Sequence, residues 1–285
     1  MTMETFDVHG FVEQQLAVWP EVRERYAALD NVERKHFIFD GYRIEVQHNP
    51  ARINSTGAKI DKRAIAARPC FLCSTNRPPQ QLAQHYGNYE ILVNPFPIFR
   101  HHLTIALQRH EPQRLIGHVG DMCRLSRLLP GMVVFFNGAQ CGASAPDHMH
   151  FQAGDRSDWP IFDDYCAKQE YAVAQGIMTA DGIGRRVYRI ETSDEQDVER
   201  RVTKLLEMQN ISEAMTNVLV TNDAQNVNIY IIPRKAFRPW QYDKLLKISP
   251  ASVEVGGVFI APVSEHFAKI TSADVEDILR QVCFQ

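Results

Sequence analysis

The sequence lacks any hydrophobic run approaching the ~20 residues that a membrane-spanning helix needs. It also lacks an excess of charge of one sign, because 31 basic residues stand against 34 acidic residues and give a formal net charge of −3. A chain with this balance does not have the broad basic surface that is typical of nucleic-acid-binding proteins. We therefore expect neither a membrane nor a nucleic acid among the partners of this protein.

The first ten residues contain acidic side chains and no apolar stretch, which argues against a secretory signal and predicts a cytoplasmic protein. Cysteine is scarce, with six residues in the chain of 285. Without an export signal, such thiols are more often metal ligands or buried side chains than disulfides. Four of them are scattered and are interpreted as small buried hydrophobic residues, namely Cys123, Cys141, Cys166 and Cys283.

The chain has enough apolar residues for a sizeable core, with 45% hydrophobic and 23% charged residues. Apolar residues at helical spacing predict helices over 11–29, 113–129 and 195–208 and from about residue 271. Strand-like runs are predicted over 37–46 (a hairpin around Asp40-Gly41), 89–94, 103–107, 131–137, 148–153, 218–220, 227–232 and 253–261. Residues 48–68 form a polar, basic loop. This mixture predicts an α+β fold.

The two halves of the chain resemble each other as distant copies. At an offset of about 126 residues, three segments of the first half resemble segments of the second half: 91–94 resembles 218–221, 103–106 resembles 229–232, and 131–135 resembles 256–260. At the same offset, position 148 corresponds to Asp274, inside the last predicted helix. We therefore predict a duplication in which the second copy has lost the histidine strand of the first.

Two histidines and a glutamine alternate in the segment Asp147-His148-Met149-His150-Phe151-Gln152. In an extended strand, successive side chains point to opposite faces of the sheet. His148, His150 and Gln152 are therefore expected on one face, with Met149 and Phe151 in a core behind it. Such a face can bind a metal, attack an electrophile and donate a hydrogen bond. The pattern also suits a strand whose polar face has no chemical role.

Cys70-Phe71-Leu72-Cys73 is a Cys-x-x-Cys knuckle that can bring two thiolates to one Zn²⁺ ion. The same spacing occurs in redox motifs, although no thioredoxin-like βαβ pattern surrounds it. Tetrahedral zinc needs two more ligands, and the candidates near predicted strand ends are His101, His102, His110 and His148. The placement of His110 and His148 favours a closed Cys₂His₂ site that pins the histidine strand to the N-terminal loop.

Together these segments resemble the galactose-1-phosphate uridylyltransferase branch of the histidine-triad superfamily. That branch also contains nucleoside-diphosphate-hexose phosphorylases and dinucleoside tetraphosphate phosphorylases. The segments that carry the resemblance are Cys70–Cys73 with Asn76-Arg77, Asn94-Pro95-Phe96-Pro97 with His101-His102-Leu103, Asn137–Gly142, and Ser144–Gln152. It covers residues 52–152 well and extends more loosely to the C-terminus.

The resemblance implies a histidine-triad-like antiparallel sheet with helices, in two pseudo-repeated halves of which the second is degenerate. We expect an N-terminal helix and hairpin at 1–50, a catalytic half at 51–155, and a half at 156–285 that completes the substrate site. The resemblance further implies structural zinc on Cys70, Cys73, His110 and His148. It makes His150 the nucleophile, which neutral imidazole suits at cytoplasmic pH.

Gln152 stands where hydrolases of the superfamily usually carry a third histidine. An amide can donate and accept hydrogen bonds but cannot activate water as a base. This favours transfer to a phosphate anion over hydrolysis. The residues that the resemblance places around the substrate are Arg52, Leu72, Asn94, Phe96, Asn137, Gly142 and Ser144. Other basic residues are interpreted as parts of a solvated surface, namely Lys59, Arg77, Arg234 and Arg238.

The sequence departs from the uridylyltransferases where these contact the hexose. The positions of their lysine, aromatic residue and glutamate are occupied here by Ser252, Gly257 and Val258, and Pro95 replaces an acidic residue that contacts the nucleoside. We therefore expect a nucleotidyltransferase or phosphorylase acting on a nucleotide sugar, with a sugar 1-phosphate or inorganic phosphate as acceptor. The alternatives are a dinucleoside polyphosphate phosphorylase or hydrolase, and a non-catalytic nucleotide-binding protein. By analogy, we expect the protein to form a homodimer.

Overall fold

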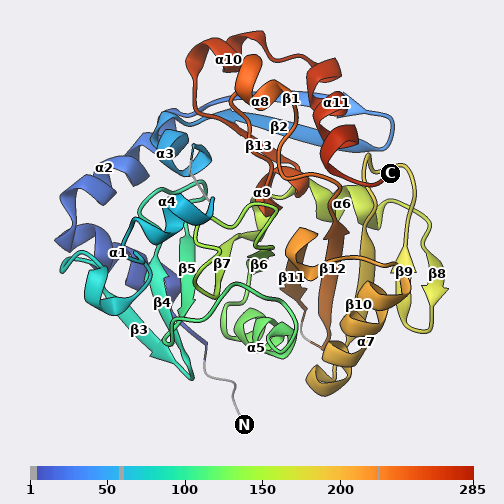
Figure 1. Cartoon of the computed structure of the whole chain (residues 1–285), viewed down its shortest axis with the longest axis horizontal. Helices are drawn as coiled ribbons and strands as arrows, with labels where there is room; N and C mark the ends of the chain where they lie inside the picture. Colours follow the sequence, from blue (N-terminus) through green and yellow to red (C-terminus); the bar gives the residue numbers. More distant parts are fainter. Residues whose placement is uncertain (1–4, 58–60, 224) are drawn as a thin grey trace.

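A computed structural model describes residues 5–57, 61–223 and 225–285. Lys59, one of the basic residues singled out above, lies outside these ranges. A ten-stranded sheet crosses the molecule in the order β3-β4-β5-β7-β6-β11-β12-β10-β9-β8 (Figure 1), and its neighbouring strands are antiparallel. Its strands are β3 (Ala83–Tyr86), β4 (Tyr89–Val93), β5 (His102–Leu107), β6 (Met132–Asn137), β7 (His150–Asp155), β8 (Tyr171–Ala174), β9 (Ile177–Thr179), β10 (Tyr188–Thr192), β11 (Thr216–Asn222) and β12 (Val227–Pro233).

A second, three-stranded sheet lies beside the large one, at the top of Figure 1. It contains the predicted hairpin, β1 (Glu33–Phe39) and β2 (Tyr42–His48), and the parallel strand β13 (Val258–Ala261). Residues from both ends of the chain therefore meet in one sheet. The predicted division into 1–50, 51–155 and 156–285 stays a prediction.

The large sheet is buried on both faces, which explains why its central strands are almost continuously apolar. In β6, Val134 and Phe136 pack into one core, together with helices α5 (Val119–Leu128) and α7 (Glu195–Met208). The alternate residues Val133 and Phe135 pack into a second core, under the small sheet. The cavity described below opens on this second side.

The sheet confirms the predicted α+β fold, and the order of its strands is that of a duplication. Each half consists of a hairpin, a strand, a helix and two more strands: β3, β4, β5, α5, β6 and β7, then β8, β9, β10, α7, β11 and β12. The halves meet where β6 pairs with β11, with Phe136 opposite Val218.

The offset of about 126 residues between the copies was wrong. Residues 256–260, aligned with 131–135 at that offset, run into β13 of the small sheet, whereas the strand order makes β11 the counterpart of β6. Short Val/Ile-rich strands that are buried on both faces resemble one another in sequence whichever residues are aligned. Three such matches were therefore not enough to determine which segments of the two copies correspond. The counterpart of β7 is β12, and this strand contains no histidine.

The remaining helices refine the predicted ones. The predicted helix at 11–29 is divided before Pro20 into α1 (Val8–Val18) and α2 (Pro20–Ala28), and the helix at 195–208 is found as predicted. The closing helix α11 (Ser272–Val282) begins at a capping box in which Thr271 and Asp274 bond reciprocally. None of the helices in the described part of the chain is long and apolar enough to cross a membrane.

Most of the short helical turns lie in segments predicted as loops. The turns are α3 (Ile53–Thr56), α4 (Lys62–Ala66), α6 (Pro160–Cys166), α8 (Gln241–Lys244), α9 (Ser252–Val255), α10 (Ser264–Lys269), and the 3-10 turns Leu29–Asn31, Pro50–Arg52, Ser74–Asn76, Arg156–Asp158 and Glu213–Met215. The strand predicted over 253–261 was wrong in its first part, where α9 precedes β13. The turn at Pro50–Arg52, α3 and α9 lie over the face of β5, β6 and β7 on which the cavity opens, and they supply part of its wall.

Candidate active site

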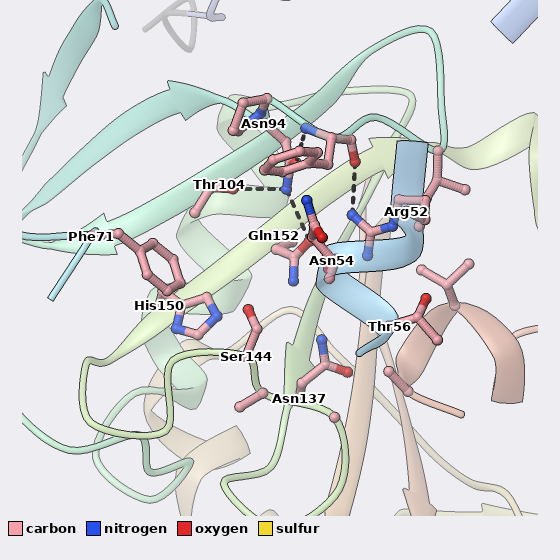
Figure 2. A pocket seen from close by; sticks show the side chains of 18 of the residues that line it. Arg52, Asn54, Thr56, Phe71, Asn94, Thr104, Asn137, Ser144, His150 and Gln152 are labelled. Carbon is pink, nitrogen blue, oxygen red and sulfur yellow. Dashed lines mark hydrogen bonds between the residues drawn. The ribbon is translucent and has the colours of Figure 1, made fainter. Parts of the chain in front are cut away.

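A cavity of about 720 Å³ lies over the centre of the first half of the sheet. All the residues predicted to react or to surround the substrate line it: Arg52, Leu72, Asn94, Phe96, Asn137, Gly142, Ser144, His150 and Gln152 (Figure 2). They come from segments spread over a hundred residues of sequence, and folding brings them to one concave surface. Their roles in binding and catalysis stay predictions.

His150 is the first residue of β7 and is 4% exposed. Its Nδ1 lies 2.8 Å from the carbonyl oxygen of His148. A carbonyl can only accept, so Nδ1 carries the proton and Nε2 keeps its lone pair. Burial lowers the pKa of His150 to about 4, which keeps the ring neutral. Figure 2 shows this ring in the cavity, on the side of Phe71 and Ser144. The geometry leaves an uncharged imidazole nitrogen available to an electrophile.

Arg52 supplies positive charge to another part of the cavity wall. Its Nη1 donates to the carbonyl oxygen of Phe96 at 2.7 Å, and its buried Nε has no hydrogen-bond partner among the described residues. Burial lowers the pKa of Arg52 to about 10, so the guanidinium remains charged at neutral pH. The nearby carboxyl of Glu254 is also buried, and burial raises its pKa. A buried donor without a partner in a cavity wall favours an anionic ligand.

The loop between β6 and β7 approaches the C-terminal part of the chain at Gly142. This glycine has φ +121°, a conformation that side chains with a Cβ rarely adopt. A Cβ here would also lie 2.5 Å from the Cβ of Ala251. Glycine therefore allows the loop that contains Ser144 to lie against the segment leading into α9, where the second half closes the cavity.

Two of the basic residues assigned to a solvated surface are buried instead. The side chain of Arg77 is 7% exposed and pairs with Glu90 at 2.5 Å, and Arg234 is 3% exposed. Arg238 lines the cavity, where its guanidinium lies 3.9 Å from the ring centre of Tyr242. Sequence alone could not show these placements, because they depend on which elements pack around each side chain.

A second cluster lies next to the cavity and contains the predicted zinc ligands Cys70, Cys73, His110 and His148. Their ligand atoms all lie within 4.8 Å of one another. The Nδ1 of His148 is 3.2 Å from the Sγ of Cys70 and 3.2 Å from the Nδ1 of His110, which in turn is 3.3 Å from the Sγ of Cys73. Two thiols and two imidazoles in this arrangement form a group that could hold a metal ion.

The ring of His148 is oriented for such a role. Its Nε2 donates to the carbonyl oxygen of Leu107 at 2.7 Å, so Nδ1 is the nitrogen with a lone pair and points at the thiols. Two thiolates and two neutral imidazoles would balance the charge of Zn²⁺ and fill its four positions. The donor set therefore fits a closed, structural zinc site.

The predicted position of His148 on the strand was wrong in one respect. The strand begins only at His150, because the backbone N–H of His148 bonds to the carbonyl of Ala145 in a turn. His148 therefore joins the cysteines, while His150 and Gln152 face the cavity. The other metal-ligand candidates lie elsewhere, since His101 pairs with Asp155 and His102 contacts Gln152.

A family model described as a domain of unknown function, DUF4922, matches residues 11–155. The chain belongs to the DUF4922 family. The match runs from within α1 to the end of β7 and thus includes both the metal-ligand cluster and the residues of the cavity that belong to the first half. A comparison with curated protein sequences finds no match.

Solved structures with the fold of this DUF4922 chain include yeast Ap4A phosphorylase in three states. Its complex with Ap4A aligns over 95% of this chain and 97% of the yeast chain, with 17% identity and a TM-score of 0.63. The AMP complex aligns over 95% of this chain and 96% of the yeast chain, with 18% identity and a TM-score of 0.61. A further structure of the enzyme aligns over 93% and 94% of the two chains, with 17% identity and a TM-score of 0.61. At this identity the match shows a shared fold, and it is the fold that the resemblance in sequence implied.

The roles of two residues in the DUF4922 site were not predicted. Gln113 is 6% exposed; its Oε1 accepts from the backbone N–H of His150 at 2.8 Å, and its Nε2 donates to the carbonyls of Asn137 and His150 at 3.0 Å each. These three hydrogen bonds connect the end of β6 to the start of β7. His102 is fully buried and contacts Gln152. Gln113 stands in no motif. His102 belongs to a segment that carries the resemblance and was a metal-ligand candidate, but its contact with Gln152 was not predicted.

Proposed function

We propose that this chain is a nucleotidyl-transferring enzyme that works through a covalent nucleotidyl-His150 intermediate. The observation that carries the proposal is the orientation of His150, whose Nδ1–H is bonded to the His148 carbonyl and whose Nε2 is left for the cavity. A nucleophile needs this lone pair, and the hydrogen bond holds the ring in the required tautomer.

In the proposed first step, Nε2 of His150 attacks the α-phosphorus of the bound nucleotide. A P–N bond forms, the P–O bond to the rest of the substrate breaks, and the leaving phosphate takes the electron pair. In the second step an oxygen of inorganic phosphate or of a sugar phosphate attacks the same phosphorus. The P–N bond breaks and the imidazole is regenerated. The charged Arg52, with its unpartnered Nε, supports binding of the phosphates.

We propose a nucleotide sugar as the substrate and phosphate or a sugar 1-phosphate as the acceptor. A second candidate is a dinucleoside polyphosphate, which is favoured by the fold shared with yeast Ap4A phosphorylase over 95% of this chain. Both substrates present an α-phosphorus with a phosphorylated leaving group, so the same chemistry serves both.

The experiment that tests the proposal offers the purified protein UDP-, GDP- and ADP-sugars and dinucleoside polyphosphates, each with and without inorganic phosphate. Consumption that requires phosphate and yields a nucleoside diphosphate identifies a phosphorylase. Consumption that requires a sugar 1-phosphate identifies a transferase. Binding of nucleotides without any turnover in all conditions would overturn the proposal and leave a nucleotide-binding protein.

Replacing Gln152 by histidine should shift the reaction toward water. Gln152 offers no base, whereas an imidazole at this position can accept a proton from water as it attacks the nucleotidyl group. We expect the ratio of hydrolysis to transfer to rise by about tenfold or more, since general base catalysis contributes roughly 10²- to 10⁴-fold. The measurement is the yield of nucleoside monophosphate relative to diphosphate at fixed phosphate. Gln152→Asn, which also lacks a base, is the matched control and should not raise this ratio.

A further inference from the structure

We propose that His102 and Asn217 are positioning residues that orient two amides of the cavity, Gln152 and Asn137, with their NH₂ groups toward the substrate. The catalytic part of this inference rests on the proposed function, whereas the orientation itself does not. Each arrangement is a chain of hydrogen bonds that begins at a group able only to donate, so the direction of every later bond follows.

The first chain begins at the backbone N–H of Ile98, which donates to Nδ1 of His102 at 3.2 Å. His102 is fully buried, and burial lowers its pKa to about 3, so the ring is neutral and its single proton is on Nε2. This Nε2–H lies 3.0 Å from the Oε1 of Gln152 and donates to it.

The amide of Gln152 cannot be turned around without cost. Asn94 also donates to the same oxygen from its Nδ2, at 3.4 Å, because the Oδ1 of Asn94 accepts the backbone N–H of Phe96 at 2.9 Å. A flipped Gln152 would bring its NH₂ against two donors. Its NH₂ group therefore points away from them, and Figure 2 shows it directed into the cavity.

The second chain of hydrogen bonds begins at Arg234, whose guanidinium can donate hydrogen bonds but cannot accept them. Its Nη1 donates to the Oδ1 of Asn217 at 2.6 Å. The Nδ2 of Asn217 then donates to the Cys141 carbonyl at 3.0 Å and to the Oδ1 of Asn137 at 3.1 Å. Both the oxygen and the nitrogen of the Asn217 amide thus have fixed roles.

The same oxygen of Asn137 accepts a second bond, from the backbone N–H of Ser252 at 2.8 Å. Two donors on one oxygen leave the Nδ2 of Asn137 for the cavity, which this residue lines. Arg234 and Ser252 belong to the second half of the chain. The second half therefore acts on the site of the first half through the orientation of an amide.

The two oriented amides both neighbour His150. Gln152 follows it in β7, and Asn137 ends the neighbouring strand β6, where Gln113 bonds to the carbonyls of both Asn137 and His150. The ligand atoms that meet two such NH₂ groups must be acceptors. The non-bridging oxygens of a phosphate fit this requirement, and the negative charge that they carry during transfer strengthens both bonds.

One test of the orientation does not depend on activity. The tautomer of His102 can be read from long-range ¹H–¹⁵N correlations of histidine-labelled protein, with the signals assigned by their loss in His102→Gln. The expected result is a neutral ring protonated on Nε2 between pH 6 and 8. A proton on Nδ1 of His102, or a cationic ring, would be incompatible with the bond from Ile98 to Nδ1. Either result would overturn the inference, whether or not the protein is active.

A second test measures the coupling between His102 and Gln152 in the rate of nucleotidyl-protein formation. His102→Leu should slow this step by roughly 10- to 100-fold. This effect is smaller than that expected for removing a donor to the substrate, because the Gln152 amide is still present. His102→Gln, which keeps a donor, should recover part of the rate. In a Gln152→Ala background, His102→Leu should cause no further loss, because the residue through which it acts is gone.

The control is His118→Leu, since His118 is also buried but bonds to Tyr89 outside the cavity. We expect it to change the rate by no more than about twofold, as for an independent site. Equal losses from His102→Leu with and without Gln152 would mean that His102 acts through packing, which would overturn its assigned role. If the unaltered protein forms no adduct at all, the proposed function fails and the tautomer alone decides the inference.

Discussion

Replacing His150 by alanine should abolish turnover and covalent labelling together. The imidazole supplies the only nucleophile that the proposal allows, so its removal closes the two-step route. Loss of a nucleophile in a covalent mechanism lowers kcat by roughly 10³- to 10⁶-fold. The measurement is the initial rate of substrate consumption under saturating phosphate, on the substrate that the panel identifies.

The fold should survive this substitution. The backbone N–H of residue 150 donates to the Oε1 of Gln113, and this bond remains in the variant. Unchanged binding of a nucleoside monophosphate would show that the cavity is intact. The surface residue His85, which contacts Gln108, provides the matched control, and His85→Ala should keep full activity. A His150→Ala protein that retains more than about a tenth of the rate would contradict the covalent route.

Removing the metal-ligand cluster should produce the largest change in stability. We propose that the cluster binds one structural Zn²⁺ per chain, because two thiols and two imidazoles lie within 4.8 Å of one another. A metal that binds only the folded state at about 1,000 times its Kd adds about 4.1 kcal/mol to the free energy of unfolding. For a chain of this size, Cys70→Ser should therefore lower Tm by roughly 8 to 16 °C.

The measurements are metal analysis of the purified protein and thermal unfolding with and without a strong chelator. Cys166→Ser is the control, since Cys166 does not belong to the cluster. Its interpretation as a buried residue was wrong, because Cys166 is exposed at the end of α6. The loss should also slow catalysis, because the His148 carbonyl accepts the hydrogen bond from Nδ1–H that fixes the His150 tautomer. Protein that contains no metal and unfolds at the same temperature after Cys70→Ser would remove the zinc proposal.

Patterns local in the sequence predicted the elements around the site. Alternation placed His150 and Gln152 on one strand, and the run of charged and apolar residues gave the bounds of α7. The short strands β8, β9 and β10 were missed. They run from residue 171 to 192, and each is too short to display a period by itself. Their place at the edge of the sheet comes from the second half of the duplication.

The residues that orient the site could not be predicted, since their roles are set by partners distant in the chain. Asn217 is separated by 80 positions from Asn137, and His102 by 50 from Gln152. A buried histidine in a β-strand has no signature that distinguishes a hydrogen-bond donor from a core residue. His148 shows the opposite case: the sequence identified its partners correctly but not the turn that separates it from the strand.

The most direct test of the account is the intact mass of the protein after mixing with its substrate in the absence of phosphate. We predict an added mass of one nucleoside monophosphate per chain, attached to His150, stable in base, labile in acid and removed by phosphate. A substrate that is consumed while the protein never gains this mass, or an adduct located on another residue, would contradict the account.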